Sequence, residues 1–148
     1  MKEIRELACR LVQQYAATSP FELCDLLAVN VFQCELPAQM GGVSFQTEEN
    51  NSVILLNRNL GKMERCYCCA HELGHVMLHP NLNALSIAEH TFLCVPRFEK
   101  EADYFAACLL IEPHLAEWNE CYETLTVNQI ACLSGLPLKV AQLWVANR

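Results

Sequence analysis

Long apolar runs are missing from this chain of 148 residues. No stretch offers the roughly 18 uninterrupted apolar residues that a membrane-spanning helix needs, and the N-terminus lacks the apolar run of a signal peptide. We therefore expect a soluble, cytoplasmic protein. Because 53% of the residues are hydrophobic, the chain should bury a sizeable core within one compact domain.

Positive charge and glycine are also scarce. The 10 Lys and Arg residues are outnumbered by 17 Asp and Glu residues, which gives a formal net charge of -7. Such a surface repels polyanions, so we expect no direct nucleic-acid partner. The 5 glycines form neither a glycine-rich phosphate loop nor the Gly-x-Ser-x-Gly turn of serine hydrolases. The common sites for nucleotides and for serine nucleophiles are therefore not expected.

Cysteine, by contrast, is plentiful, with 10 residues. A disulfide framework is typical of small secreted domains, whereas this chain is long, rich in core residues and without a signal peptide, so we expect reduced thiols. Cys66, Cys68 and Cys69 form a local cluster, and buried packing is the ordinary role of such residues. A rival hypothesis makes them soft ligands of a metal or redox sensor. It would be ruled out if their replacement by serine left bound zinc undiminished.

The hydrophobic pattern predicts an α+β fold. N-terminal helices should precede a small, mostly antiparallel sheet, followed by a metal-binding helix packed on a second ligand-bearing helix and a short helical tail. Ser19, with Pro20 next and Glu22 three residues on, predicts the start of the second helix. The expected elements are helices at about 4–15, 20–27, 61–79 and 98–111, a strand at 29–36, and hairpin arms at 43–45 and 53–56.

We expect a single domain over residues 1–148, with its metal-binding core at about 52–113 and a helical tail at about 120–148. In the tail, Ala131 and Gly135 have the mutual spacing of a helix-turn-helix motif. Only two basic residues lie nearby, so DNA contact is not expected, and packing or the docking of a protein substrate is the favoured role.

The strongest motif is His-Glu-Leu-Gly-His at residues 71–75, which matches His-Glu-x-x-His. Residues four apart on a helix share a face, so His71 and His75 can both reach one zinc ion, with each bond about 2.0 to 2.1 Å long. Glu72 is then placed to act as general base on the attacking water. The alternative is a surface helix that carries two histidines and binds no metal.

A catalytic zinc needs a third protein ligand and one position left for water. His79 lies on the same stripe as the motif histidines. However, eight residues of helix rise about 12 Å, too far for three rings to meet one ion. We therefore expect His79 to cap or pack the end of the helix.

The helix expected from about residue 98 is the better source of the third ligand. Glu99 and Asp103 lie one turn apart on one face of it. We predict that Glu99 binds the metal and that Asp103 accepts the outer N–H of a ligand histidine, which fixes the tautomer. Glu101 points about 160° away in an ideal helix, but fraying of the first turn keeps it as an alternative ligand. It also stays open that these acidic residues only favour the helix dipole.

Residues 70–79 together with 99–110 resemble the ImmA/IrrE family of metallo-endopeptidases, and a weaker likeness extends over about residues 8–113. The resemblance implies a zinc peptidase of bacteria or their mobile elements, of a kind that in some members cleaves a helix-turn-helix repressor to release stress or transfer genes. It also implies the roles of ligand for His71, His75 and Glu99, and of base for Glu72. One departure is Glu112, since a hydrophobic residue usually precedes the proline at that point.

Together these features predict a gluzincin-like, zinc-dependent endopeptidase that hydrolyses a peptide bond in a protein substrate, with a transcriptional repressor as the candidate. Tyr67 or His90 could stabilise the oxyanion, and an exposed hairpin edge could bind an extended substrate. The alternative is a non-catalytic regulatory module that binds proteins and keeps a structural or vestigial metal. In that case Glu72→Gln should leave the biological effect intact.

Overall fold

The first two helices of the computed structural model, which describes residues 1–17, 19–80 and 95–148, follow the predicted pattern. They are α1 (Lys2–Tyr15) and α2 (Pro20–Leu26). Ser19 caps α2, since its side-chain oxygen accepts a hydrogen bond from the backbone N–H of Glu22 at 3.2 Å. α1 places Ile4, Ala8 and Leu11 in the core, as expected from their helical spacing.

The sheet has three strands, β1 (Asn30–Cys34), β2 (Gly42–Gln46) and β3 (Ser52–Asn57), in the order β1-β3-β2. β2 and β3 form the predicted antiparallel hairpin, but β1 pairs with β3 in parallel, so the sheet is mixed rather than mostly antiparallel. The reason is that β3 carries the most apolar run and takes the central position. β1 must then occupy the free side of β3, and its apolar pattern does not encode its direction.

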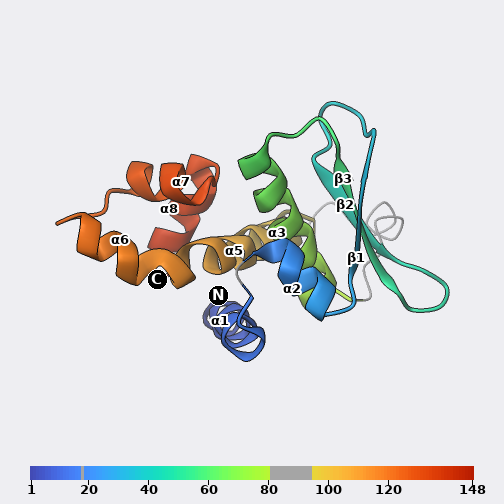
Figure 1. Ribbon diagram of the computed structural model, residues 1–148, viewed down its shortest axis with the longest axis horizontal. Helices are drawn as coiled ribbons and strands as arrows, with labels where there is room; N and C mark the ends of the chain where they lie inside the picture. The colour runs from blue at the N-terminus through green and yellow to red at the C-terminus, as the bar shows by residue number, and fades with distance from the viewer. Residues whose placement is uncertain (18, 81–94) are drawn as a thin grey trace.

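Two long helices, α3 (Lys62–Leu78) and α5 (Val95–Ile111), pack against each other at the centre of the molecule (Figure 1). α5 begins three residues earlier than predicted, because Pro96 is accommodated in its first turn, where a missing N–H costs little. A Cβ placed on Gly74 would lie 3.1 Å from the Cα of Ala102. The two backbones therefore approach closely only because residue 74 lacks a side chain.

The C-terminal part forms a short 3-10 turn, η1 (Glu112–His114), and three helices, α6 (Leu115–Cys121), α7 (Val127–Ser134) and α8 (Leu138–Ala146). α7 and α8 correspond to the helical tail expected at about 120–148. η1 and α6 begin between the helix expected at 98–111 and the tail expected from about 120, where no element was predicted. Pro113 stands in the first turn of η1. α7 and α8 follow each other through Gly135, which adopts a left-handed conformation with φ 71°.

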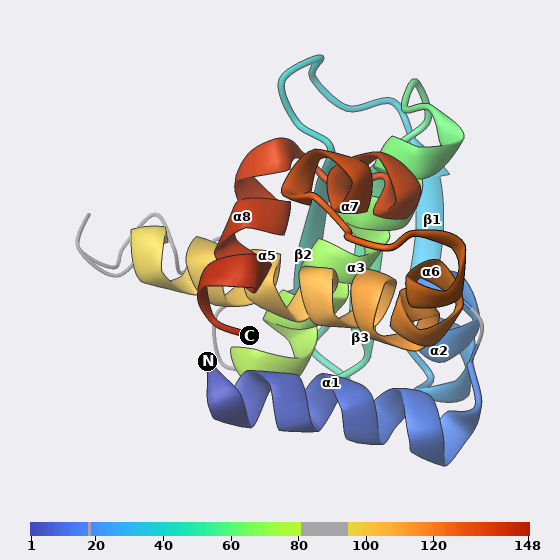
Figure 2. The same cartoon turned by 90° about the vertical axis from the view of Figure 1, so that its left-hand side faces the viewer.

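The core is one cluster of buried side chains that draws on helices from α1 to α8. α5 lies between α1 on one side and α8 on the other (Figure 2). Glu112, directly after the C-terminal end of α5, connects this helix with α1 and α8. Its carboxylate lies 2.7 Å from Nε of Arg5 and accepts a 3.0 Å hydrogen bond from Nε1 of Trp144, which is fully buried. None of the helices in the described residues is long and apolar enough to cross a membrane. The predicted α+β class is confirmed.

Candidate metal centre

His71, His75 and Glu99 come together where α3 meets α5. The two Nε2 atoms lie 3.1 Å apart, and each lies 3.3 Å from an oxygen of Glu99. A tetrahedral zinc ion with bonds of about 2.0 to 2.1 Å sets its ligand atoms roughly 3.3 Å apart. Among the described residues, this is the one group of His, Cys, Asp or Glu side chains that could hold a metal ion. The donors, two imidazoles and a carboxylate, fit a catalytic zinc.

Glu72 lies beside this group, on the side of α3 that faces the sheet. It is only 8% exposed, and a Cβ placed on Gly42 would lie 3.0 Å from its Cγ. The start of β2 therefore packs directly against the side chain of Glu72. Glu72, the predicted base, thus lies next to the predicted ligand His71 and against β2.

Asp103 lies behind the ligands, as the spacing predicts. Its Oδ1 accepts a hydrogen bond from Nδ1 of His71 at 2.9 Å, so Nε2 of that ring is the nitrogen that points to Glu99 and His75. The same oxygen accepts the Tyr67 hydroxyl at 2.7 Å. The Tyr67 hydroxyl is therefore hydrogen-bonded to Asp103 in the metal-free protein, and its role as an oxyanion donor stays a prediction. The position of Tyr67 one turn before His71, on the same face of α3, is the sequence feature that could have indicated this contact.

The pKa values in the metal-free protein follow from these contacts. Burial alone would lower the pKa of His71, but hydrogen bonds to Asp103 and Glu99 outweigh burial and raise it to about 9. Hydrogen bonds to His71 and His75 hold the pKa of Glu99 far below its usual range. Burial and then the bond to Asp103 raise the pKa of Tyr67. At neutral pH a proton on His71 and the charge of Glu99 therefore stabilise the site.

The other candidates lie elsewhere or outside the described residues. His79 is the C-cap of α3, and its Nε2 is 3.2 Å from Oε2 of Glu101. Neither residue belongs to the group that could hold a metal. This agrees with a packing role for His79, and the geometry favours Glu99 over Glu101. His90, the other oxyanion candidate, falls outside the described residues.

The cysteine cluster is separate from the ligand group. Cys69 is fully buried, and its Sγ lies 3.8 Å from that of Cys24, while Cys66 and Cys68 are half-buried. Burial raises the pKa of Cys66, and burial together with the nearby Glu72 raises that of Cys68 to about 11. All cysteines within the described residues are free thiols. The surroundings therefore disfavour the thiolate that metal binding requires.

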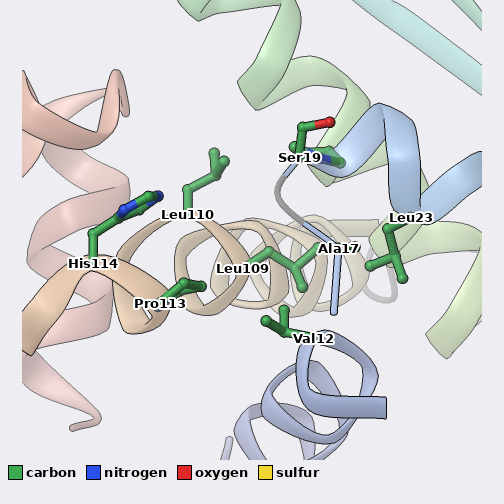
Figure 3. Close-up of a pocket in the computed structure, with 9 residues that line it drawn as sticks. Val12, Ala17, Ser19, Leu23, Leu109, Leu110, Pro113 and His114 are labelled. Atoms are coloured by element: carbon green, nitrogen blue, oxygen red, sulfur yellow. The ribbon is translucent and has the colours of Figure 1, made fainter. Parts of the chain in front are cut away.

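A cavity of about 210 Å³ lies between α1, α2 and α5 (Figure 3). Its walls are apolar apart from Ser19 and His114, and it contains none of the three ligand residues. It therefore offers no donor set for a metal.

Comparison with known proteins places these observations in a family. A peptidase family model described as an IrrE N-terminal-like domain matches residues 24–131. Immunity region protein 2 of Bacillus phage phi105 is 33% identical over 140 residues, which span 95% of this chain and 87% of that protein. Metallopeptidase ImmA of Bacillus subtilis strain 168 is 23% identical over 137 residues, or 92% of this chain and 80% of that protein.

The fold also has a solved counterpart. A Mycobacterium tuberculosis transcriptional regulator superposes with a TM-score of 0.65 at 14% identity, over 99% of this chain. This chain spans 47% of the length of that regulator. At such low identity the likeness concerns the fold alone.

Proposed function

This chain belongs to the IrrE N-terminal-like family of peptidases, and we propose that it is a zinc-dependent endopeptidase that cleaves a peptide bond in a protein substrate. Family membership gives it a metallopeptidase-type function. The observation that carries the proposal is the convergence of the ligand residues: the two Nε2 atoms lie 3.1 Å apart, and each lies 3.3 Å from a different oxygen of Glu99, with Glu72 next to His71 in the sequence. Three protein ligands leave one position of a tetrahedral ion for water, which distinguishes a catalytic site from a closed structural one.

The protein side chains divide the chemistry among them. A bound zinc ion supplies Lewis-acid polarisation of the scissile carbonyl and lowers the pKa of the attacking water. Glu72 takes the proton from that water and returns it to the leaving amine. Asp103 holds Nδ1 of His71, which keeps Nε2 directed at the metal and makes the ring a stronger ligand.

The substrate is proposed to bind in an extended form along β2. Among the described residues this strand pairs with β3 alone, so it stands at an edge of the three-stranded sheet. It also packs against α3, and its first residue, Gly42, lies over Glu72. A peptide that added to this edge would run past the general base and the metal ligands.

A helix-turn-helix transcriptional repressor is the substrate that we propose. The likeness to a protein of a phage immunity region supports a regulatory substrate. We also propose that residues 1–148 act as one peptidase domain, which is supported by the single buried cluster from Ile4 to Trp144.

The test is incubation of the zinc-loaded protein with the repressor encoded beside its gene, followed by mass spectrometry of the products. We expect cleavage by the wild-type protein and a rate at least roughly a hundredfold lower for Glu72→Gln with an unchanged zinc content. Glu120→Gln, the same change at an exposed position of α6, is the matched control and should cleave normally.

Equal cleavage by wild type and Glu72→Gln would remove the general base from the mechanism. If the repressor stays intact but is still inactivated by both proteins, the chain acts as a binding module instead of a peptidase.

A further inference from the structure

His79 stands out among the residues near the metal centre because it is buried without an aligned hydrogen bond. Its side chain is 2% exposed. Within the described residues, neither ring nitrogen has a hydrogen-bond partner, although Nε2 lies 3.2 Å from a Glu101 oxygen. A buried polar group in this state destabilises the folded protein relative to an apolar side chain of similar shape. The contacts of His79 should therefore serve something other than stability.

Those contacts are made with the first turns of α5. The ring of Phe98 meets the imidazole edge-on with centroids 4.6 Å apart, and Glu101 provides the polar contact. Glu101 also accepts a 2.8 Å hydrogen bond from Nε of Arg97, which stands one turn earlier in α5. His79 thus connects the end of α3 with two residues that flank Glu99 in the sequence.

Glu99 needs such support more than the two histidines do. The side chains of His71 and His75 are only 15% and 11% exposed, whereas 47% of the Glu99 side chain is exposed. Glu99 also stands in only the second turn of α5, and helix ends fray. The position of the third ligand therefore depends on how firmly the start of α5 is held against α3.

We propose that His79 is a positioning residue for Glu99. It holds the first turns of α5 against the end of α3 through Phe98 and Glu101, so that the carboxylate meets His71 and His75. The role rests on the metal site of the proposed function, but it concerns metal affinity and needs no peptidase activity. The metal itself is the probe.

The experiment is a double-mutant cycle on zinc affinity, measured by competition with a chelating dye. His79→Leu should weaken zinc binding by about tenfold to a hundredfold in the wild-type background, the range found for residues that orient ligands. In the Glu99→Ala background the same change should alter affinity by less than about threefold, because the group through which His79 acts is gone.

Two further measurements separate positioning from a structural role. Urea unfolding of the metal-free protein should show His79→Leu to be as stable as the wild type or more so, since an unsatisfied buried imidazole is replaced by an apolar group. The matched control is His114→Leu, the same substitution at an exposed histidine stacked on Trp118, and it should leave zinc affinity unchanged.

Several results would overturn the proposal. These are unchanged zinc affinity in His79→Leu, an equal loss of affinity in both backgrounds, or a loss of affinity that is matched by a loss of stability. If the wild-type protein bound no zinc, the positioning role and the proposed function would both fall. Zinc binding without peptide cleavage would refute only the proposed function.

Discussion

Replacement of Asp103 by asparagine should change how zinc affinity depends on pH. Asp103 accepts the Nδ1 proton of His71 at 2.9 Å, and this charged contact is a main reason why the pKa of the metal-free imidazole rises to about 9. Zinc binds the neutral ring, so at pH 7 it must displace a proton from the wild-type site. Asparagine keeps an acceptor oxygen but removes the charge, so His71 should release its proton more readily.

The size of the effect follows from the pKa. The folded-state value lies above the ordinary 6.5, so the protonated form persists until the pH passes about 9. Wild-type affinity should therefore rise by about tenfold per pH unit between pH 7 and pH 9, roughly a hundredfold in all. Loss of the Asp103 charge should lower the affinity of the neutral His71 ring for zinc by about tenfold to a hundredfold. It also lowers the pKa of His71, so that less of the binding energy is spent on displacing its proton at pH 7. Asp103→Asn should thus be close to wild type at pH 7 and clearly weaker at pH 9.

The assay is competition with one chelator of known pH dependence, applied to both proteins at each pH, so that zinc hydrolysis cancels in the ratio. Tyr67→Phe is the control, because it removes a 2.7 Å hydrogen bond to the same Asp103 oxygen and keeps the charge beside His71. Its profile should follow that of the wild type. Parallel profiles for wild type and Asp103→Asn, or a flat wild-type profile, would refute the reasoning.

The remaining predictions concern stability, packing and the thiols. Glu112→Ala should lower the free energy of unfolding by about 2 to 4 kcal/mol, because it leaves the indole N–H of Trp144 unsatisfied, and the half-exposed Arg5 adds little to this loss. Glu112→Gln keeps an acceptor for the indole, so it should lower the free energy of unfolding by only about 1 kcal/mol. Equal urea midpoints for the two variants would contradict this prediction. Gly74→Ala should lower the free energy of unfolding by about 1 to 3 kcal/mol and weaken zinc binding, because the added methyl group meets the backbone of α5. Helix propensity alone would instead raise the free energy of unfolding by about 1 kcal/mol, so the same unfolding assay distinguishes the two effects. Serine at Cys66, Cys68 and Cys69 should leave one zinc per chain by metal analysis, and a loss of zinc in a folded protein would instead make the thiols ligands.

Local signals in the sequence predicted the parts of the fold and site that depend on neighbours along the chain. The Ser19 cap and the one-turn spacings of His71 with His75 and of Glu99 with Asp103 are set by helix geometry alone. The close approach of α3 and α5 could also be predicted, because Gly74 and Ala102 are small. These features brought the candidate ligands to one place.

Features that depend on tertiary contacts were not predictable. The parallel direction of β1 is set by which strand takes the centre of the sheet. The start of α6 depends on η1, in whose first turn Pro113 stands. Glu112 looked like a departure from the family pattern, yet it connects Arg5 of α1 with Trp144 of α8, residues far from it in the sequence. The contact of His79 with Phe98 and Glu101 likewise exists only once two helices are packed.

X-ray absorption at the zinc edge tests the central claim most directly, since that claim is that His71, His75 and Glu99 bind a single zinc ion. We predict only nitrogen and oxygen neighbours at about 2.0 to 2.1 Å, with the multiple-scattering features of two imidazoles and a changed first shell in Glu99→Ala. A sulfur shell near 2.3 Å, or a Glu99→Ala spectrum identical to that of the wild type, would contradict the account.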